Sequence, residues 1–155
     1  IVVLQSFSKP YAMTGWRLGY LMADAPVVEQ IQKVHQYSVV SVSAFTQQAC
    51  VEALQYDNSR EMETFRRRRD YVWGRLQAMG LEVEKPEGAF YLFPSIEKYG
   101  IPSGEFCTRM IREAGLALTP GSCFSAEGFV RISYCYSDDA LKEGMDRLER
   151  FLRSL

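Results

Sequence analysis

The chain has 155 residues, of which 47% are hydrophobic and 24% are charged, and its formal net charge is -1. This length and apolar share are enough for an ordinary domain with a hydrophobic core. The near-neutral charge argues against a nucleic-acid partner and an anionic membrane surface. No apolar run approaches the ~20 residues that a membrane span needs. The sequence therefore predicts a globular protein with no nucleic-acid and no membrane partner.

The chain starts without methionine, directly in a β-type run, so we expect a fragment whose natural start lies upstream. We find no basic segment or cleavage site that would indicate a signal peptide. The four cysteines form no C-x-x-C pair and the chain has one histidine, so no metal site is expected. We expect reduced, mostly buried thiols in a cytoplasmic protein, at positions Cys50, Cys107, Cys123 and Cys135.

Two strands and two helices are predicted in the first third of the chain. Residues 1–7 (IVVLQSF) are short, β-branched and apolar, as in a buried strand, and residues 17–23 (RLGYLMA) form a second such run. Helical patterns follow over 27–37 and 44–55, and Ser43 is a suitable N-cap for the second helix.

A domain boundary is predicted at residues 57–59 (DNS), because a long helical pattern over 59–79 follows these turn-forming residues. Asn58 and Glu61 have the spacing of a capping box, and Gly80 ends the pattern. The arginine run 66–69 within this helix allows a nucleic-acid interpretation. We prefer the polar face of an amphipathic helix, because the flanks are acidic and the net charge is near zero.

The rest of the chain predicts a small antiparallel sheet with two further helices, and the last helix starts at Ser137. These elements are strands over 81–85 and 89–94, a helix over 103–115 closed by Gly115, a strand within 116–124 that runs into a Pro-Gly turn, a strand over 129–134, and a final helix with an apolar stripe from Leu141 to Leu155.

The loop between the first two strands, SFSKPYAMTGWRLGY at 6–20, has an unusual composition. It holds one lysine, Lys9, eight residues before Arg17, and the hydroxyls of Ser6 and Ser8 precede the lysine. Hydroxyls and an arginine fork are suited to a phosphate, and a desolvated lysine is a nucleophile. Together they favour a Schiff base with a phosphorylated aldehyde, as in pyridoxal 5'-phosphate. From spacing alone, a solvated lysine remains the simpler interpretation.

The string itself resembles the lysine-attachment motif of the class I, fold-type I pyridoxal-phosphate aminotransferases, the aspartate aminotransferase family. That motif reads Ser-x-Ser-Lys, then an aromatic residue, then Gly-x-Arg-x-Gly-aromatic. Segments 86–94 (PEGAFYLFP), 118–124 (LTPGSCF) and 129–134 (FVRISY) resemble later family segments in the same order. Each element of the motif is present, at Ser6, Ser8, Lys9, Tyr11, Gly15, Arg17, Gly19 and Tyr20.

The resemblance implies roles for five residues. Lys9 matches the lysine that forms the Schiff base and then carries a proton between the substrate Cα and the cofactor. Arg17 and Ser6 match phosphate-binding groups. Ser8 is included in the cofactor site, although a turn hydroxyl bonded to the backbone fits it equally well. Arg131 matches the arginine that grips the substrate α-carboxylate.

The residues around Arg131 are compatible with that role. An arginine in an apolar strand, between Val130 and Ile132, should not be buried without an anion, and a carboxylate fits its fork. The alternative is an edge-strand arginine facing solvent. Phe90 and Tyr91 lie in a strand where an aromatic residue usually belongs to the core, although the resemblance allows them to approach the substrate.

The resemblance implies an α/β fold, the C-terminal fragment of a fold-type I transferase. Residues 1–57 are then the tail of the large mixed-sheet domain that binds pyridoxal phosphate. Residues 58–155 are the small α+β domain, with helix 59–79 as a bridge. The implied function is amino-group transfer between an L-amino acid and a 2-oxo acid in a cytoplasmic homodimer. The fragment alone is expected to be inactive, since other residues that hold the cofactor ring lie upstream in family order.

Two alternatives remain open from sequence. One keeps the fold and changes the reaction, to a pyridoxal-phosphate carbon–sulfur β-lyase or an aminocyclopropane-carboxylate synthase-like enzyme. The other is not an enzyme, because aminotransferase-like domains also serve as ligand-sensing parts of transcription regulators.

Overall fold

The computed structural model describes residues 1–155 and divides into two compact units, Ile1–Arg60 and Glu61–Leu155. The sequence predicts a boundary after residue 57. No helix of the chain combines the length and the apolar character needed to cross a membrane.

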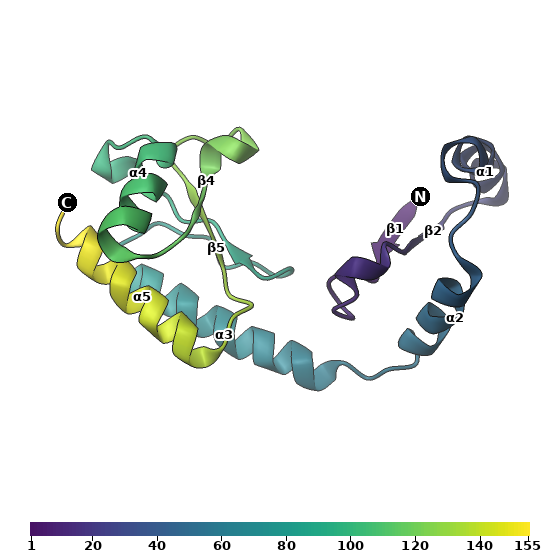
Figure 1. Cartoon of the computed structure of the whole chain (residues 1–155), viewed down its shortest axis with the longest axis horizontal. Helices are drawn as coiled ribbons and strands as arrows, with labels where there is room; N and C mark the ends of the chain where they lie inside the picture. The colour runs from purple at the N-terminus through teal and green to yellow at the C-terminus, as the bar shows by residue number, and fades with distance from the viewer. The chain divides into compact units, whose positions relative to one another are not determined.

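The first unit is built on an antiparallel strand pair, β1 (Val3–Ser6) and β2 (Gly19–Met22). The helices α1 (Ala25–Val39) and α2 (Ala44–Ala53) follow, so both predicted strands and both predicted helices are confirmed (Figure 1). The strands approach closely at Gly19, where a Cβ atom would lie 2.6 Å from the Gln5 carbonyl oxygen. Only glycine fits this position without a shift of the backbone.

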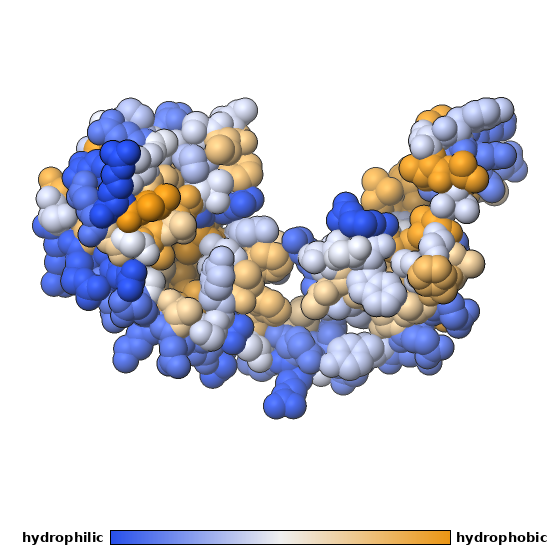
Figure 2. Space-filling view, in the orientation of Figure 1, coloured by the Kyte–Doolittle hydropathy of each residue, from blue (hydrophilic) through white to orange (hydrophobic).

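Burial is sparse in this unit. Its buried residues are Phe7, Thr46 and Cys50, and α1 contains none. Yet α1 carries Val27 and Ile31 one turn apart, 40% and 37% exposed. Figure 2 shows hydrophobic side chains at the surface in the α1 region. The first unit thus leaves apolar surface uncovered in this chain.

The second unit packs two long helices with a small sheet. Helices α3 (Ser59–Ala78) and α5 (Asp138–Leu152) run alongside each other and parallel (Figure 1), with ion pairs from Arg68 to Asp138 and from Arg75 to Asp146. The antiparallel sheet has the order β3-β5-β4, and its strands are β3 (Tyr91–Leu92), β4 (Thr119–Pro120) and β5 (Val130–Ser133).

Helix α4 (Ser103–Arg109) continues as a π-helical turn over Met110–Ala114. Gly115 ends it in the left-handed conformation, at φ 63°, as predicted. One continuous core joins α3, α4, α5 and the sheet, and it includes Leu76, Leu92, Phe106, Val130, Ile132, Met145 and Leu148.

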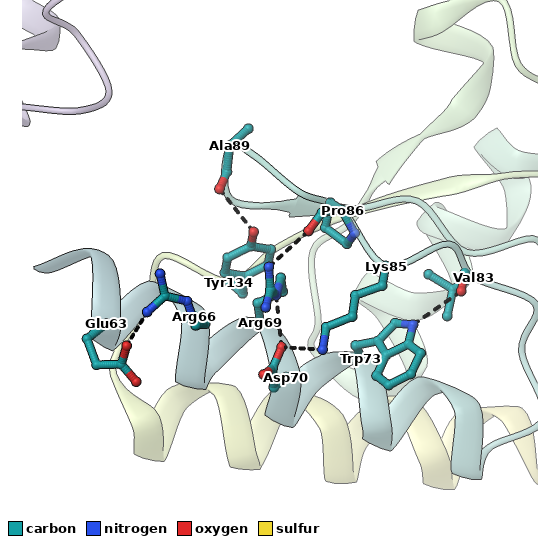
Figure 3. Close-up of polar contacts among 10 residues, drawn as sticks. All are labelled: Glu63, Arg66, Arg69, Asp70, Trp73, Val83, Lys85, Pro86, Ala89 and Tyr134. Atoms are coloured by element: carbon teal, nitrogen blue, oxygen red, sulfur yellow. Dashed lines mark hydrogen bonds and ion pairs between the residues drawn. The ribbon is translucent and has the colours of Figure 1, made fainter. Parts of the chain in front are cut away.

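The predicted strand over 81–85 is wrong. No neighbouring strand bonds to the backbone of residues 81–85. Its carbonyl groups accept hydrogen bonds from a side chain of α3 and from the segment after β3. The indole of Trp73 donates to the carbonyl oxygen of Val83 at 3.3 Å (Figure 3), and the Ser95 amide donates to the carbonyl of Glu82 at 2.9 Å. The segment therefore lies against α3 as an extended loop.

Of the predicted helix starts, one is confirmed. The Ser137 hydroxyl accepts from the Ala140 amide at 3.3 Å. Ser43 occupies the N-cap position of α2, but its side chain makes no capping hydrogen bond. The Asn58 amide nitrogen donates to the Pro10 carbonyl at 3.0 Å, and the capping role of its oxygen at α3 stays a prediction.

The arginine run in α3 forms the polar face that we prefer from sequence. Arg66 pairs with Glu63, Arg67 and Arg68 both pair with Asp138, and Arg69 pairs with Asp70.

The cysteines are all free, and the expected burial holds for half of them. Cys50 and Cys107 are buried, whereas Cys123 and Cys135 are exposed. Burial raises the pKa of the Cys107 thiol to about 11, so this thiol is inert at neutral pH.

Candidate functional site

The predicted lysine loop lies at the open end of the β1–β2 hairpin. The last ladder pair joins Ser6 to Gly19, and one further hydrogen bond runs from the Phe7 amide to the Leu18 carbonyl at 3.2 Å. The chain therefore leaves the hairpin through Ser8 and Lys9 and re-enters it at Arg17. The strand register brings the predicted cofactor residues to the same edge of the unit, although they are up to eleven positions apart in sequence.

Two contacts hold this loop in place. Phe7 is 4% exposed, and its ring packs against those of Tyr11 and Tyr20, with centroid distances of 5.4 and 5.6 Å. Asn58 donates to the carbonyl of Pro10, the residue after Lys9. The position of the lysine backbone is thus supported on both sides.

The loop backbone takes two conformations that are costly for residues other than glycine. Ala12 and Arg17 have φ angles of 54° and 55°. The Arg17 guanidinium donates to the Thr14 carbonyl at 3.1 Å. Since a guanidinium has five N–H groups, it keeps donors for an anion. The Ser6 hydroxyl accepts from the Ser8 amide at 3.1 Å, and its own proton remains available for donation.

Most of the predicted cofactor residues are accessible to solvent in this chain. Lys9, Ser6 and Arg17 are exposed, and Ser8 is half-buried. The physical reason is the two-stranded sheet: neither β1 nor β2 contains a buried residue, so nothing in this unit desolvates the loop.

The donor set nevertheless fits the implied cofactor. Residues 6–20 contain hydroxyls, one guanidinium and one amine, and they contain no aspartate or glutamate that would repel a phosphate. Lys9 is the only amine in this set, and a primary amine is the group that condenses with an aldehyde.

The fifth predicted residue, Arg131, lies in the second unit, on β5. It is half-buried, and its guanidinium carbon lies 4.5 Å from the ring centroids of both Tyr91 and Phe124. Arg131 forms no ion pair, in contrast to Arg75, which pairs with Asp146 and Glu149. Its charge is therefore available to an anionic ligand.

The loop that carries Phe124 is fixed by a carboxylate. Glu127 accepts hydrogen bonds from the amide and the hydroxyl of Ser103, at 2.5 and 3.0 Å, and the Ser103 hydroxyl accepts from the Ser122 amide at 3.2 Å. These donors, the Ser103 amide first, lower the pKa of Glu127 below its usual value. At neutral pH the carboxylate therefore joins the start of α4 to this loop.

Three of these supporting residues are not identified by sequence reasoning. Asn58 has the spacing of a helix cap, and Phe124 reads as one apolar residue in a turn. Glu127 bonds to a residue 24 positions away, and no periodic pattern signals such a contact.

The chain was compared with protein families and with individual proteins of known name. Residues 1–148 match the model of a family described as aminotransferase class I and II. A Bacillus subtilis protein named "Probable N-acetyl-LL-diaminopimelate aminotransferase" is 47% identical over 97% of this chain and 40% of its own length. The aromatic-amino-acid aminotransferase 2 of Thermococcus litoralis is 44% identical over 98% of this chain and 41% of its own length.

Solved structures agree. The aspartate aminotransferase of Thermotoga maritima superposes with a TM-score of 0.93 at 40% identity, over 99% of this chain and 40% of that one. The aromatic aminotransferase of Pyrococcus horikoshii gives 0.89 at 42% identity, over 99% and 43%. The chain thus spans about 40% of the length of these relatives. The expected fold, part of a fold-type I aminotransferase, is confirmed, and the chain belongs to the aminotransferase class I and II family.

Proposed function

We propose that this chain is part of a pyridoxal-phosphate-dependent aminotransferase that moves an amino group between an L-amino acid and a 2-oxo acid. The observation that carries the proposal is the loop at 6–20, where the hairpin gathers one lysine, two serine hydroxyls and an arginine at one edge. The relatives named above are aminotransferases, which supports transamination over the lyase and regulator alternatives.

Each predicted residue has a physical task in this reaction. Arg17 and Ser6 bind the cofactor phosphate through charge-assisted and hydroxyl hydrogen bonds, and Ser8 supports Ser6 through its amide. The Lys9 amine, once neutral, takes a proton from the substrate Cα and returns it as a general acid. Pyridoxal phosphate, when bound, supplies an electron sink for the negative charge at that carbon.

Arg131 holds the α-carboxylate, which is common to every amino acid and 2-oxo acid. A half-buried guanidinium without an ionic partner is suited to this task, because a carboxylate satisfies two of its N–H groups at once. Arg131 does not distinguish between amino donors with different side chains, so other residues must determine that specificity.

The first unit is proposed to be the tail of the large cofactor-binding domain, and the second unit the small domain, with α3 as the bridging helix. Sparse burial supports the first assignment, since a unit with three buried residues needs further chain to cover it. In the full-length protein this cover would also desolvate Lys9. The proposal includes a homodimer, because uncovered apolar surface also suits subunit contacts, and a cytoplasmic location, which four free cysteines support.

The test is chemical labelling of the full-length protein with pyridoxal phosphate and borohydride, followed by peptide mass spectrometry. We expect the label on Lys9, and we expect Lys9→Ala to abolish both the label and transamination. Lys33→Ala is the control, because Lys33 lies in α1 and bonds only to Gln30. A label on another lysine would overturn the assignment. Release of ammonia in place of a stoichiometric amino-acid product would overturn transamination.

A further inference from the structure

We propose that Tyr91 and Phe124 are positioning residues for Arg131: their rings hold the guanidinium by its flat faces and leave its N–H edge free for a carboxylate. The inference rests on the proposed function in one respect, since that function identifies the carboxylate as part of an amino acid or a 2-oxo acid.

The two rings reach Arg131 from different segments of the second unit. Tyr91 lies on β3, and Phe124 ends the short 3-10 helix Gly121–Phe124 after β4. Each ring centroid is 4.5 Å from the guanidinium carbon, yet the two rings make no stacking contact with one another. They therefore approach the guanidinium from separate sides. A guanidinium that stacks on rings directs its N–H groups outward, in its own plane.

Strand register explains the position of Tyr91. It pairs with Ser133 across β3 and β5, and Arg131 lies two residues before Ser133 on the same face of β5. Such diagonal neighbours lie within reach of long and aromatic side chains. The Tyr91–Arg131 contact is thus set by the sheet itself.

Phe124 depends on its loop and on other rings. Its ring meets that of Phe93 edge-on, with centroids 6.1 Å apart, and Phe93 stacks on Phe129 at 5.3 Å. The Glu127 contacts with Ser103 also hold this loop. Phe124 is 45% exposed, which leaves room for a ligand at its outer edge.

Holding an arginine with rings has a chemical advantage over holding it with acids. Arg75 shows the other solution in the same unit, since Asp146 and Glu149 fix it and also neutralise it. An acid at Arg131 would compete with the incoming carboxylate. Aromatic faces orient the guanidinium and keep its charge and its N–H edge available.

The experiment uses the full-length enzyme loaded with pyridoxal phosphate. Phe124→Leu and Tyr91→Leu each remove one ring, whereas Phe124→Tyr and Tyr91→Phe keep it. We expect each leucine variant to raise KM for the amino donor about five-fold, with kcat little changed, because the contact holds substrate and transition state alike. The ring-keeping variants should restore KM. Tyr136→Leu, at an exposed position with no ring contact, is the matched control.

A second readout is independent of turnover. The Nε–H proton of Arg131 should show an upfield ring-current shift in NMR, reduced in each leucine variant and kept in Phe124→Tyr. Acetate, which presents only a carboxylate, should shift the same resonance and bind more weakly to the leucine variants.

The outcomes separate the two proposals. Unchanged KM in both leucine variants, together with a large KM increase in Arg131→Gln, would overturn the role of the rings and leave the proposed function standing. Unchanged KM in Arg131→Gln would remove the carboxylate site itself. Equal losses of kcat in leucine and ring-keeping variants would also contradict the inference, because they would indicate a merely structural role.

Discussion

Glu127 is the residue whose charge state governs the loop beside Arg131. Its pKa lies below the usual value because the Ser103 amide, and then the Gly128 amide, donate to the carboxylate. A lowered folded-state pKa contributes stability that is present above the ordinary pKa and is lost as the pH falls through the folded value. We therefore expect Glu127→Gln to lower the unfolding midpoint at pH 7, and the difference from the native protein to shrink between about pH 5 and about pH 3.

Thermal unfolding across that pH range checks this expectation. Glu84→Gln is the control, because Glu84 is exposed and should change the midpoint little at any pH. A constant difference between Glu127→Gln and the native protein down to pH 3 would show that the carboxylate charge is not what holds the loop.

Single residues also show how far the sequence predicts the site. The lysine loop is predictable, because its residues are local in sequence and the hairpin only has to bring its two ends together. The exposure of Lys9 is not, since desolvation depends on whatever covers β1 and β2. The partners of Arg131 lie 40 and 7 positions before it, so neither spacing nor periodicity links them.

Helix α3 contributes two buried side chains, Val72 and Leu76, to the core of the second unit. Leu76 is fully buried on this helix, and Gln77 is exposed beside it. We expect Leu76→Ala to lower the free energy of unfolding by about 2–5 kcal/mol, through lost apolar burial and the cavity left behind. Gln77→Ala should change it by less than about 0.5 kcal/mol. Denaturant unfolding measures the free-energy change in both variants. Equal changes would show that Leu76 is not part of the stabilising core.

Helices and strands could be predicted where the residues within each element determine its conformation. The helices follow from periodic apolar residues and from stops such as Gly115, and the final helix keeps its serine cap. The segment 81–85 has a strand-like pattern but no strand beside it. Instead, the indole of Trp73 on α3 donates a hydrogen bond to the Val83 carbonyl. A local sequence pattern does not indicate that a distant side chain will bind the backbone groups of a predicted strand.

At the scale of the whole molecule, the two units differ in how they protect their backbones. Helices α1 and α5 both have 15 residues, but α1 buries none of them and α5 buries six. In the 155-residue chain we expect α1 amides to exchange with solvent much faster than α5 amides, because a helix with few buried contacts has a low free energy of local unfolding. Hydrogen-exchange mass spectrometry tests this, and equal protection of the two helices would contradict it.

The chain has two tryptophans, and the units hold one each: Trp16, 49% exposed in the lysine loop, and Trp73, half-buried against Val83. Intrinsic fluorescence therefore contains a separate optical signal for each half of the chain. Trp16→Phe leaves an emission that reports only the docking of the extended segment on α3. Trp73→Phe leaves one that reports only events at the lysine loop, so ligand addition and unfolding can be followed in each half without an added dye.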